Sequence, residues 1–173
     1  MTLFPCLVAT LLAVAGSVRA QDVKQKYVGK SSCAHDIQSD GPDFGSRLDK
    51  TRNTYLINRN FPKVKVLLIV QLKSENDKCG VIRDVVAITR IAKEFQFSCF
   101  DPLARGDVVV GTRNGNDTRI MGMAIEAWRI DIVNQTFNKT TDKVSCTNES
   151  YAGSDDGSDL VDVAKKRASQ SSL

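Results

Sequence analysis

The chain has 173 residues, a formal net charge of +4, 42% hydrophobic residues and 25% charged residues. This balance excludes a wholly disordered chain and a multi-pass membrane protein. Because aromatic residues make up only 6% of the sequence, the core has to be built mainly from aliphatic side chains.

Residues 1–20 carry the pattern of a signal peptide. The apolar run over residues 3–15 is shorter than the roughly 20 residues that a transmembrane helix needs. Val18 and Ala20 supply the small residues that precede a cleavage site, here before Gln21. No later run approaches membrane length, so we expect an exported protein without a membrane span.

Removal of the leader would take Cys6 away and leave four cysteines, Cys33, Cys79, Cys99 and Cys146. An even number of cysteines in an exported chain predicts two disulfides, for which three pairings are open. We favour Cys33–Cys146, which would join the two ends of the folded region, with Cys79–Cys99 closing a local excursion. Because no two cysteines are spaced as CxxC and the chain has one histidine, we predict no metal site and no cofactor.

Four N-glycosylation sequons agree with export through a eukaryotic secretory route. All of them lie after residue 115, and their acceptors are Asn116, Asn134, Asn138 and Asn148.

Residues 21–146 predict a single β-rich domain. The polar segment 21–52 is broken by serine, glycine and proline and predicts an extended lead-in tied down at Cys33. Alternating and apolar runs then predict strands, whereas residues 79–93 fit both a helix and a strand. The fold class we expect is mainly β, an antiparallel β-sandwich-like single domain with one short helix, braced by two disulfides. The predicted strands are 54–58, 63–73, 94–99, 107–112 and 118–133.

Three local features refine this prediction. Asn114-Gly115 predicts a type I′ turn joining two adjacent antiparallel strands, because both central residues of that turn need a positive φ. Gly122 predicts a bulge within 118–133. Trp128 falls on the apolar phase of the same run, so we expect it in the core.

Residues 147–173 differ in composition from the domain before them. Serines and clustered aspartates predict a polar, acidic and disordered tail. Within it, residues 159–168 have acids at the start and bases at the end, which favours a short helix because these charges oppose the helix dipole.

No residue set predicts a catalytic site. His35 is the only histidine, and its place beside a predicted disulfide in a polar segment favours an ordinary surface histidine over a general base. Glycoside hydrolysis needs only two carboxylates, and acids on the predicted strands could supply them. A secreted hydrolase, ribonuclease-like or glycan-cleaving, is therefore the alternative to a binding function. The candidate carboxylates are Glu94, Asp107, Glu126 and Asp131.

Basic residues gather between residues 47 and 78, where eight lysines and arginines stand against three acids. Such a surface attracts an anionic partner, or it simply keeps one face of the domain solvated. The sequence has few aromatic residues for base stacking and no nucleic-acid motif, so nucleic acid is not the predicted partner. Our candidate residues for binding a host or extracellular protein are Arg59, Lys63 and Lys65.

The chain combines a leader with β patterning, no catalytic motif and four later cysteines, Cys33, Cys79, Cys99 and Cys146. This layout resembles the small secreted effectors of plant-pathogenic fungi. The resemblance implies a virulence factor that binds a host protein in the apoplast or after uptake, on a β-sandwich or a ribonuclease-like scaffold. In the ribonuclease-like group an inactive site is common, which the lone His35 would fit.

Two features depart from that class, since it demands neither the acidic tail nor four sequons. An animal or parasite surface antigen would share most of these traits. A carbohydrate- or lipid-binding module is a third hypothesis, for which Trp128 would be the platform if it were exposed.

Overall fold

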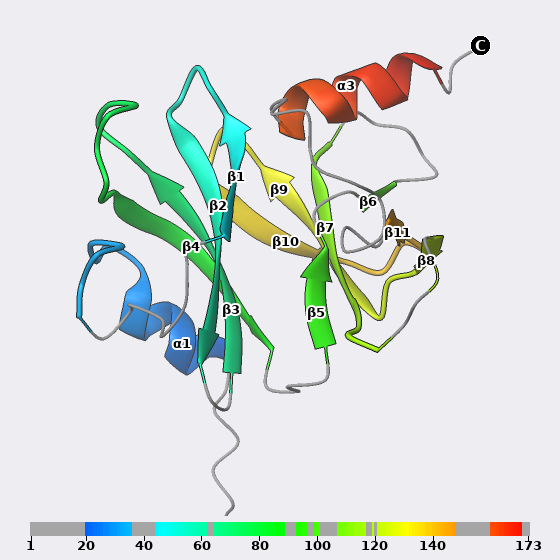
Figure 1. Cartoon of the computed structure of the whole chain (residues 1–173), viewed down its shortest axis with the longest axis horizontal. Helices are drawn as coiled ribbons and strands as arrows, with labels where there is room; N and C mark the ends of the chain where they lie inside the picture. The colour runs from blue at the N-terminus through cyan, green and yellow to red at the C-terminus, as the bar shows by residue number, and fades with distance from the viewer. Residues whose placement is uncertain are drawn as a thin grey trace, which may run out of the picture.

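The computed structural model contains two four-stranded antiparallel sheets and a smaller sheet of three strands (Figure 1). A helix lies near each end of the described chain. The predicted mainly β architecture of packed antiparallel sheets is confirmed. The residues that the structure describes are 20–35, 44–61, 64–88, 93–96, 99–100, 107–116, 119, 121–147 and 160–170.

The first sheet is covered on both faces, which explains why its strand β3 is apolar throughout its middle. Residues 66–70 of β3 are all buried, as expected of a strand with no solvated face. Helix α1 (Ala20–Tyr27) covers the outer face through Val23 and Tyr27, which are four residues apart and both buried. The strands, in spatial order, are β1 (Phe44–Asp49), β2 (Thr54–Phe61), β3 (Val64–Gln71) and β4 (Val81–Ile88).

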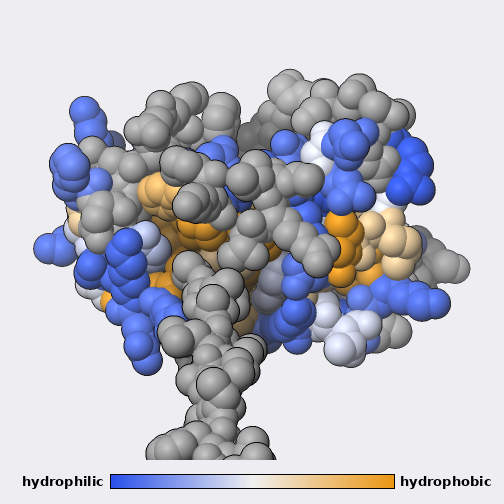
Figure 2. All heavy atoms as spheres, turned by 90° about the horizontal axis from the view of Figure 1, so that it is seen from below, coloured by the Kyte–Doolittle hydropathy of each residue, from blue (hydrophilic) through white to orange (hydrophobic). Residues whose placement is uncertain are grey.

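The second sheet packs against the other face of the first, and the main core lies between them. Trp128 is 7% exposed in this core, with its ring centroid 6.2 Å from that of Phe95; its predicted burial is confirmed. Seen from below, hydrophobic side chains lie between hydrophilic ones at the periphery (Figure 2). The strands, in spatial order, are β10 (Thr136–Thr140), β9 (Glu126–Asp131), β7 (Val109–Asn114) and β5 (Lys93–Gln96).

Asp84 connects the two large sheets where their edges meet. Its buried carboxylate accepts hydrogen bonds from the amide N of Phe137 in β10 at 2.8 Å and from the amide N of Val85 at 2.8 Å. It also pairs with Lys24 Nζ of α1 at 2.9 Å. The Asp84 side chain therefore joins the first sheet both to the edge strand β10 of the second sheet and to helix α1.

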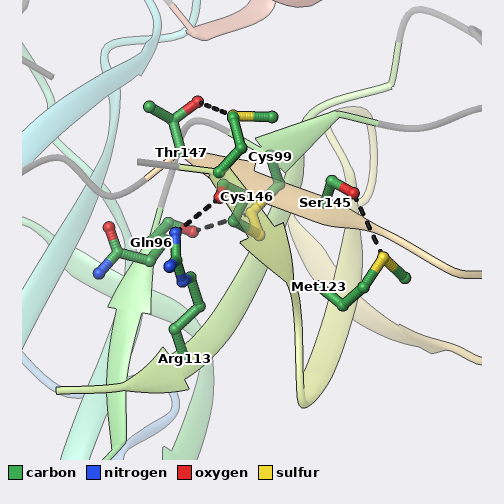
Figure 3. Close-up of a disulfide and its surroundings, with 8 residues drawn as sticks. Gln96, Cys99, Arg113, Met123, Ser145, Cys146 and Thr147 are labelled. Carbon is green, nitrogen blue, oxygen red and sulfur yellow. Dashed lines mark hydrogen bonds between the residues drawn. A yellow bond between two sulfur atoms is a disulfide. The ribbon is translucent and has the colours of Figure 1, made fainter. Parts of the chain in front are cut away.

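The third sheet packs on the outer face of the second through the Cys99–Cys146 disulfide (Figure 3). Gly111 of β7 leaves room for this bridge, because a Cβ there would lie 2.6 Å from Cys146 Sγ. The buried Arg113 donates from Nη1 to the carbonyl oxygen of Cys146 at 3.0 Å. The strands, in spatial order, are β6 (Cys99–Phe100), β11 (Ser145–Thr147) and β8 (Met121–Met123).

All four predicted cysteines form two disulfides, but the favoured pairing is wrong. The bridges are Cys33–Cys79 and Cys99–Cys146. Cys33 lies beside the start of β4 because Ser31 bridges to Val81, and Cys99 lies directly opposite Cys146 in β6 and β11. Each bridge therefore follows a local backbone pairing instead of joining the ends of the domain.

The type I′ turn predicted at Asn114-Gly115 and the bulge predicted at Gly122 are also wrong. The two predicted runs do pair antiparallel, because β7 lies beside β9, but β8, which precedes β9, pairs with β11 in another sheet. The positive-φ residues described in the structure are Asn53, Gln135 and Gly29. Gly122 sits in regular register opposite Cys146. It leaves space for Arg113, whose Nη2 would lie 3.1 Å from a Cβ there.

The segments at the two ends of the domain are more ordered than their composition suggests. The lead-in predicted to be extended over 21–52 contains α1 and β1, and the ambiguous segment 79–93 forms β4 and the start of β5. The short helix predicted at 159–168 is confirmed as α3 (Leu160–Gln170), whose Leu160 is buried in the main core.

Candidate binding cleft

Two of the three residues predicted to bind a partner are described by the structure, and these two do not form an exposed surface. Arg59 is 3% exposed and shares one face of β2 with Ile57 and Phe61. Its burial lowers the pKa of the guanidinium below the ordinary value. The Lys65 side chain is 17% exposed and pairs with Glu94 at 3.6 Å. Lys63 lies outside the described residues.

An open cleft of about 810 Å³ lies at the end of the sandwich that carries α3. Most of its lining comes from three segments far apart in the sequence: the β1–β2 turn, the end of β9 with the turn after it, and the first half of α3. Asp107, Val108 and Asn138 complete it. The lining residues are Asp49, Lys50, Thr51, Arg52, Asp107, Val108, Arg129, Ile130, Asp131, Ile132, Val133, Asn138, Val161, Asp162 and Lys165.

Apolar side chains line the inner part of the cleft and reach its rim. Val108 and Ile130 are buried, and Ile132 and Val161 are half-buried against the main core. Val133 is 71% exposed, the most exposed large hydrophobic residue among those described. The sequence already marks Val133 as unusual. Polar and apolar residues alternate along β9, and Val133 is apolar although the residues two and four positions before it, Asp131 and Arg129, are charged.

Charged side chains of both signs also line the cleft, and several of them are held in place by hydrogen bonds and ion pairs. Arg129 lies between two carboxylates, 3.2 Å from Asp107 and 2.8 Å from Asp142. Asp49 accepts from the amide N of Thr51 at 2.9 Å and pairs with Arg52 at 3.3 Å. The cleft therefore offers preformed charged groups that need little reorganisation to meet a partner.

Asp131 is fixed by the turn that follows β9. The amide N of Asn134 donates to its Oδ1 at 2.9 Å, and Asn134 Nδ2 donates to its Oδ2 at 2.7 Å. These hydrogen bonds, the backbone one first, hold the pKa of Asp131 below its ordinary range. A general acid for glycoside hydrolysis needs the opposite shift, so Asp131 is suited to roles of an ionised carboxylate, which include electrostatic contact with a partner.

The four carboxylates considered for hydrolysis are divided between two places. Asp107 and Asp131 line the cleft, whereas Glu94 and Glu126 are not among its lining residues. Glu126 lies between two lysines, 2.9 Å from Lys93 Nζ and 3.0 Å from Lys139 Nζ. The hydrogen bond from Lys93 contributes most to lowering the pKa of Glu126 below its ordinary value of 4.5.

The Glu126→Gln substitution should flatten the acid side of the pH–stability profile. Because the folded pKa is lowered, the unfolded chain binds more protons at pH values between the folded pKa and 4.5. The stabilisation is fully present above pH 4.5 and is lost as the pH falls through the folded pKa. Urea unfolding at a series of pH values should show a steeper loss below 4.5 in the wild type than in the variant. Parallel profiles would contradict this role of Glu126.

The remaining candidate residues lie away from the cleft or do not form a chemical site. His35 is exposed and is not a lining residue, and Cys33, Cys79, Cys99 and Cys146 are in disulfides. Across the described residues, no group of three or more His, Cys, Asp and Glu side chains could hold a metal ion. None of the helices described is long and apolar enough to cross a membrane.

Three of the predicted glycan acceptors, Asn116, Asn134 and Asn138, are exposed, and Asn148 lies outside the described residues. Asn138 also lines the cleft, so a glycan attached there would stand in the path of a partner.

The cleft could not be identified from the sequence, because its walls are brought together only by the fold. Comparison with protein-family models, curated proteins and solved structures gives no match for this chain.

Proposed function

We propose that the protein is exported and acts without catalysis, by binding a protein partner outside the cell, in the manner of a virulence-type effector that targets a host protein. The signal-peptide pattern of residues 1–20 supports export. Two disulfides support the same proposal, because such bonds form and persist in oxidising compartments.

The observation that carries the proposal is the exposed Val133 in a cleft lined by both apolar and charged side chains. Protein partners are anchored by apolar side chains at the centre of a contact and oriented by polar and charged groups at its rim. The cleft provides both kinds of surface, and fixed carboxylates and guanidinium groups frame the apolar part.

Other classes of ligand fit this surface less well. The described lining residues include no aromatic side chain, whereas sugar and base recognition rely on aromatic stacking. Four acidic and four basic residues line the cleft, a balance that does not favour a polyanion. Trp128, the platform considered for a carbohydrate-binding module, is buried.

The test is affinity capture from host extracts, with Val133→Asp compared against Val28→Asp. Val28 is 43% exposed, is also a valine, and is not a lining residue, so it is a matched control. A charge at the apolar anchor should weaken binding on the order of tenfold or more. A partner captured by the wild type and Val28→Asp but lost with Val133→Asp supports the proposal. A partner retained equally by all three contradicts it.

Because Asn138 lines the cleft, the captured set should be compared with and without enzymatic removal of N-glycans from the bait. If Asn138 carries a glycan, removing the glycan should increase binding, because the cleft is then open to the partner.

One specific observation favours the hydrolase alternative: Asp107 and Asp131 line the same cleft. Glycan or RNA cleavage that is lost with Asp131→Asn and retained with Val133→Asp would favour the enzyme over the binding protein. The lowered pKa of Asp131 suits an ionised base or nucleophile and not a general acid, so such a reaction would need Asp107 as the acid. In keeping with the binding proposal, we expect no cleavage by the wild type.

A further inference from the structure

A pair of exposed methionines lies on the third sheet, apart from the cleft. The chain has three methionines, and the two beyond Met1 are Met121 and Met123. They occupy alternate positions of the same short strand, β8, and therefore project from one face of it. Met121 is 49% exposed and Met123 is 51% exposed.

Each thioether sulfur accepts a hydrogen bond from a hydroxyl group on the neighbouring strand β11. Thr147 Oγ1 donates to Met121 Sδ at 3.1 Å, and Ser145 Oγ donates to Met123 Sδ at 3.3 Å. Ser145 lies directly opposite Met123, and Thr147 directly opposite Met121, in the register of β8 and β11. Figure 3 shows the Ser145–Met123 pair. The sulfurs are thus both open to solvent and next to a hydroxyl donor.

Buried contacts hold the backbone of β8 and β11 in place on the side opposite the two methionine sulfurs. Cys146 of β11 is fully buried and bonded to Cys99, and its carbonyl oxygen accepts from Arg113. Gly122, between the two methionines, lies against the Arg113 guanidinium. A chemical change at the exposed side chains therefore leaves the support of the strand in place.

We propose that Met121 and Met123 form a site of oxidation by hydroperoxides. The sulfur lone pair bonds to the terminal peroxide oxygen and the O–O bond breaks. The other oxygen leaves and takes up the proton of the transferred oxygen, which gives water from hydrogen peroxide or an alcohol from an organic hydroperoxide. Sulfur loses two electrons and the peroxide gains them, so each thioether becomes a sulfoxide. In the described part of the chain, the other sulfur atoms are held in disulfides.

The hydroxyl groups of Ser145 and Thr147 stabilise the product. A sulfoxide oxygen is a stronger acceptor than a thioether sulfur, and each hydroxyl is already within hydrogen-bond distance of the atom that is oxidised. Oxidation converts an apolar surface into a polar one while the pairing of β8 with β11 is kept.

The test exposes the disulfide-intact protein to hydrogen peroxide with N-acetylmethionine in the same tube as a rate reference. Peptide mapping should find one oxygen atom on each of Met121 and Met123, gained at the rate of the reference, with unchanged near-ultraviolet circular dichroism. The Met121→Leu/Met123→Leu variant should lose this uptake completely. Oxidation far slower than the reference, or loss of the tertiary signal, would overturn the proposal, and the wild-type map decides this even if the variant does not fold.

The role of the hydroxyls is tested by the Ser145→Ala/Thr147→Val variant. Peroxide should lower the melting temperature more in this variant than in the wild type, because its sulfoxides lack their donors. An equal shift in both proteins would overturn the assignment of Ser145 and Thr147.

Discussion

Replacing Cys99 and Cys146 by alanine should lower the free energy of unfolding by about 4 kcal/mol. The bridge joins residues 47 apart in the sequence, so its loss frees a long loop in the unfolded chain. It is also the centre of the small cluster that attaches the third sheet to β7 and β9, with Cys146 fully buried. Urea unfolding monitored by circular dichroism measures the difference.

The other disulfide is a matched control for this prediction. Cys33 and Cys79 are 46 residues apart, so their bridge constrains the unfolded chain to nearly the same extent. Cys79 is exposed and Cys33 is half-buried, so replacing this pair leaves less of a cavity. The loss should therefore be smaller than for Cys99 and Cys146. An equal or larger loss would mean that packing around the buried bridge contributes little.

The Asp84→Ala substitution should destabilise the fold by about 3 kcal/mol, because it leaves buried donors without their acceptor. The carboxylate is 5% exposed and accepts from the amides of Val85 and Phe137. Removing it leaves the Phe137 amide, at the junction of the two large sheets, without its hydrogen-bond acceptor. Thermal and urea unfolding should both report the loss.

Lys24→Met separates the ion pair from the backbone contacts of Asp84. The Lys24 side chain is 45% exposed, and an ion pair with one solvated partner contributes at most about 1 kcal/mol. This variant should remain close to the wild type in stability. A loss as large as that of Asp84→Ala would show that the ion pair, and not the Phe137 amide, explains the effect.

The parts of the fold that follow from local pattern could be predicted from the sequence. Strand β3 has a continuous apolar run because it is buried on both faces. Trp128 and Ile130 alternate with Arg129 and Asp131 because one face of β9 lies in the main core. The acids and bases at the ends of 159–168 favoured the helix that α3 forms. In each case the deciding information lies within a few residues.

Long-range pairing could not be predicted in the same way. We predicted the disulfide pairing from positions along the chain, but the true pairing depends on which strands are neighbours. Cys99 and Cys146 are bonded because β6 and β11 lie side by side. Asn114-Gly115 permits a positive φ without requiring one, so its motif did not determine the turn. Arg59 counts as a surface charge in a sequence, although its place between two apolar residues of β2 buries it.

The candidate cleft was beyond sequence reasoning for the same reason. Its walls come mainly from 49–52, 129–133 and 161–165, with residues 107, 108 and 138, and nothing local marks these segments as neighbours. Val133 alone is marked in the sequence, because it is an apolar residue that continues the polar phase of β9 into the turn after it. Its part in the cleft depends on the packing of α3 nearby.

Hydrogen exchange of the protein with and without its captured partner tests the central proposal most directly. Binding in the cleft predicts slower amide exchange in 49–52, 129–133 and 160–165, with the rest of the first sheet unchanged. Slower exchange confined to β2 and β3 around Arg59 and Lys65, with the cleft segments unaffected, would contradict it.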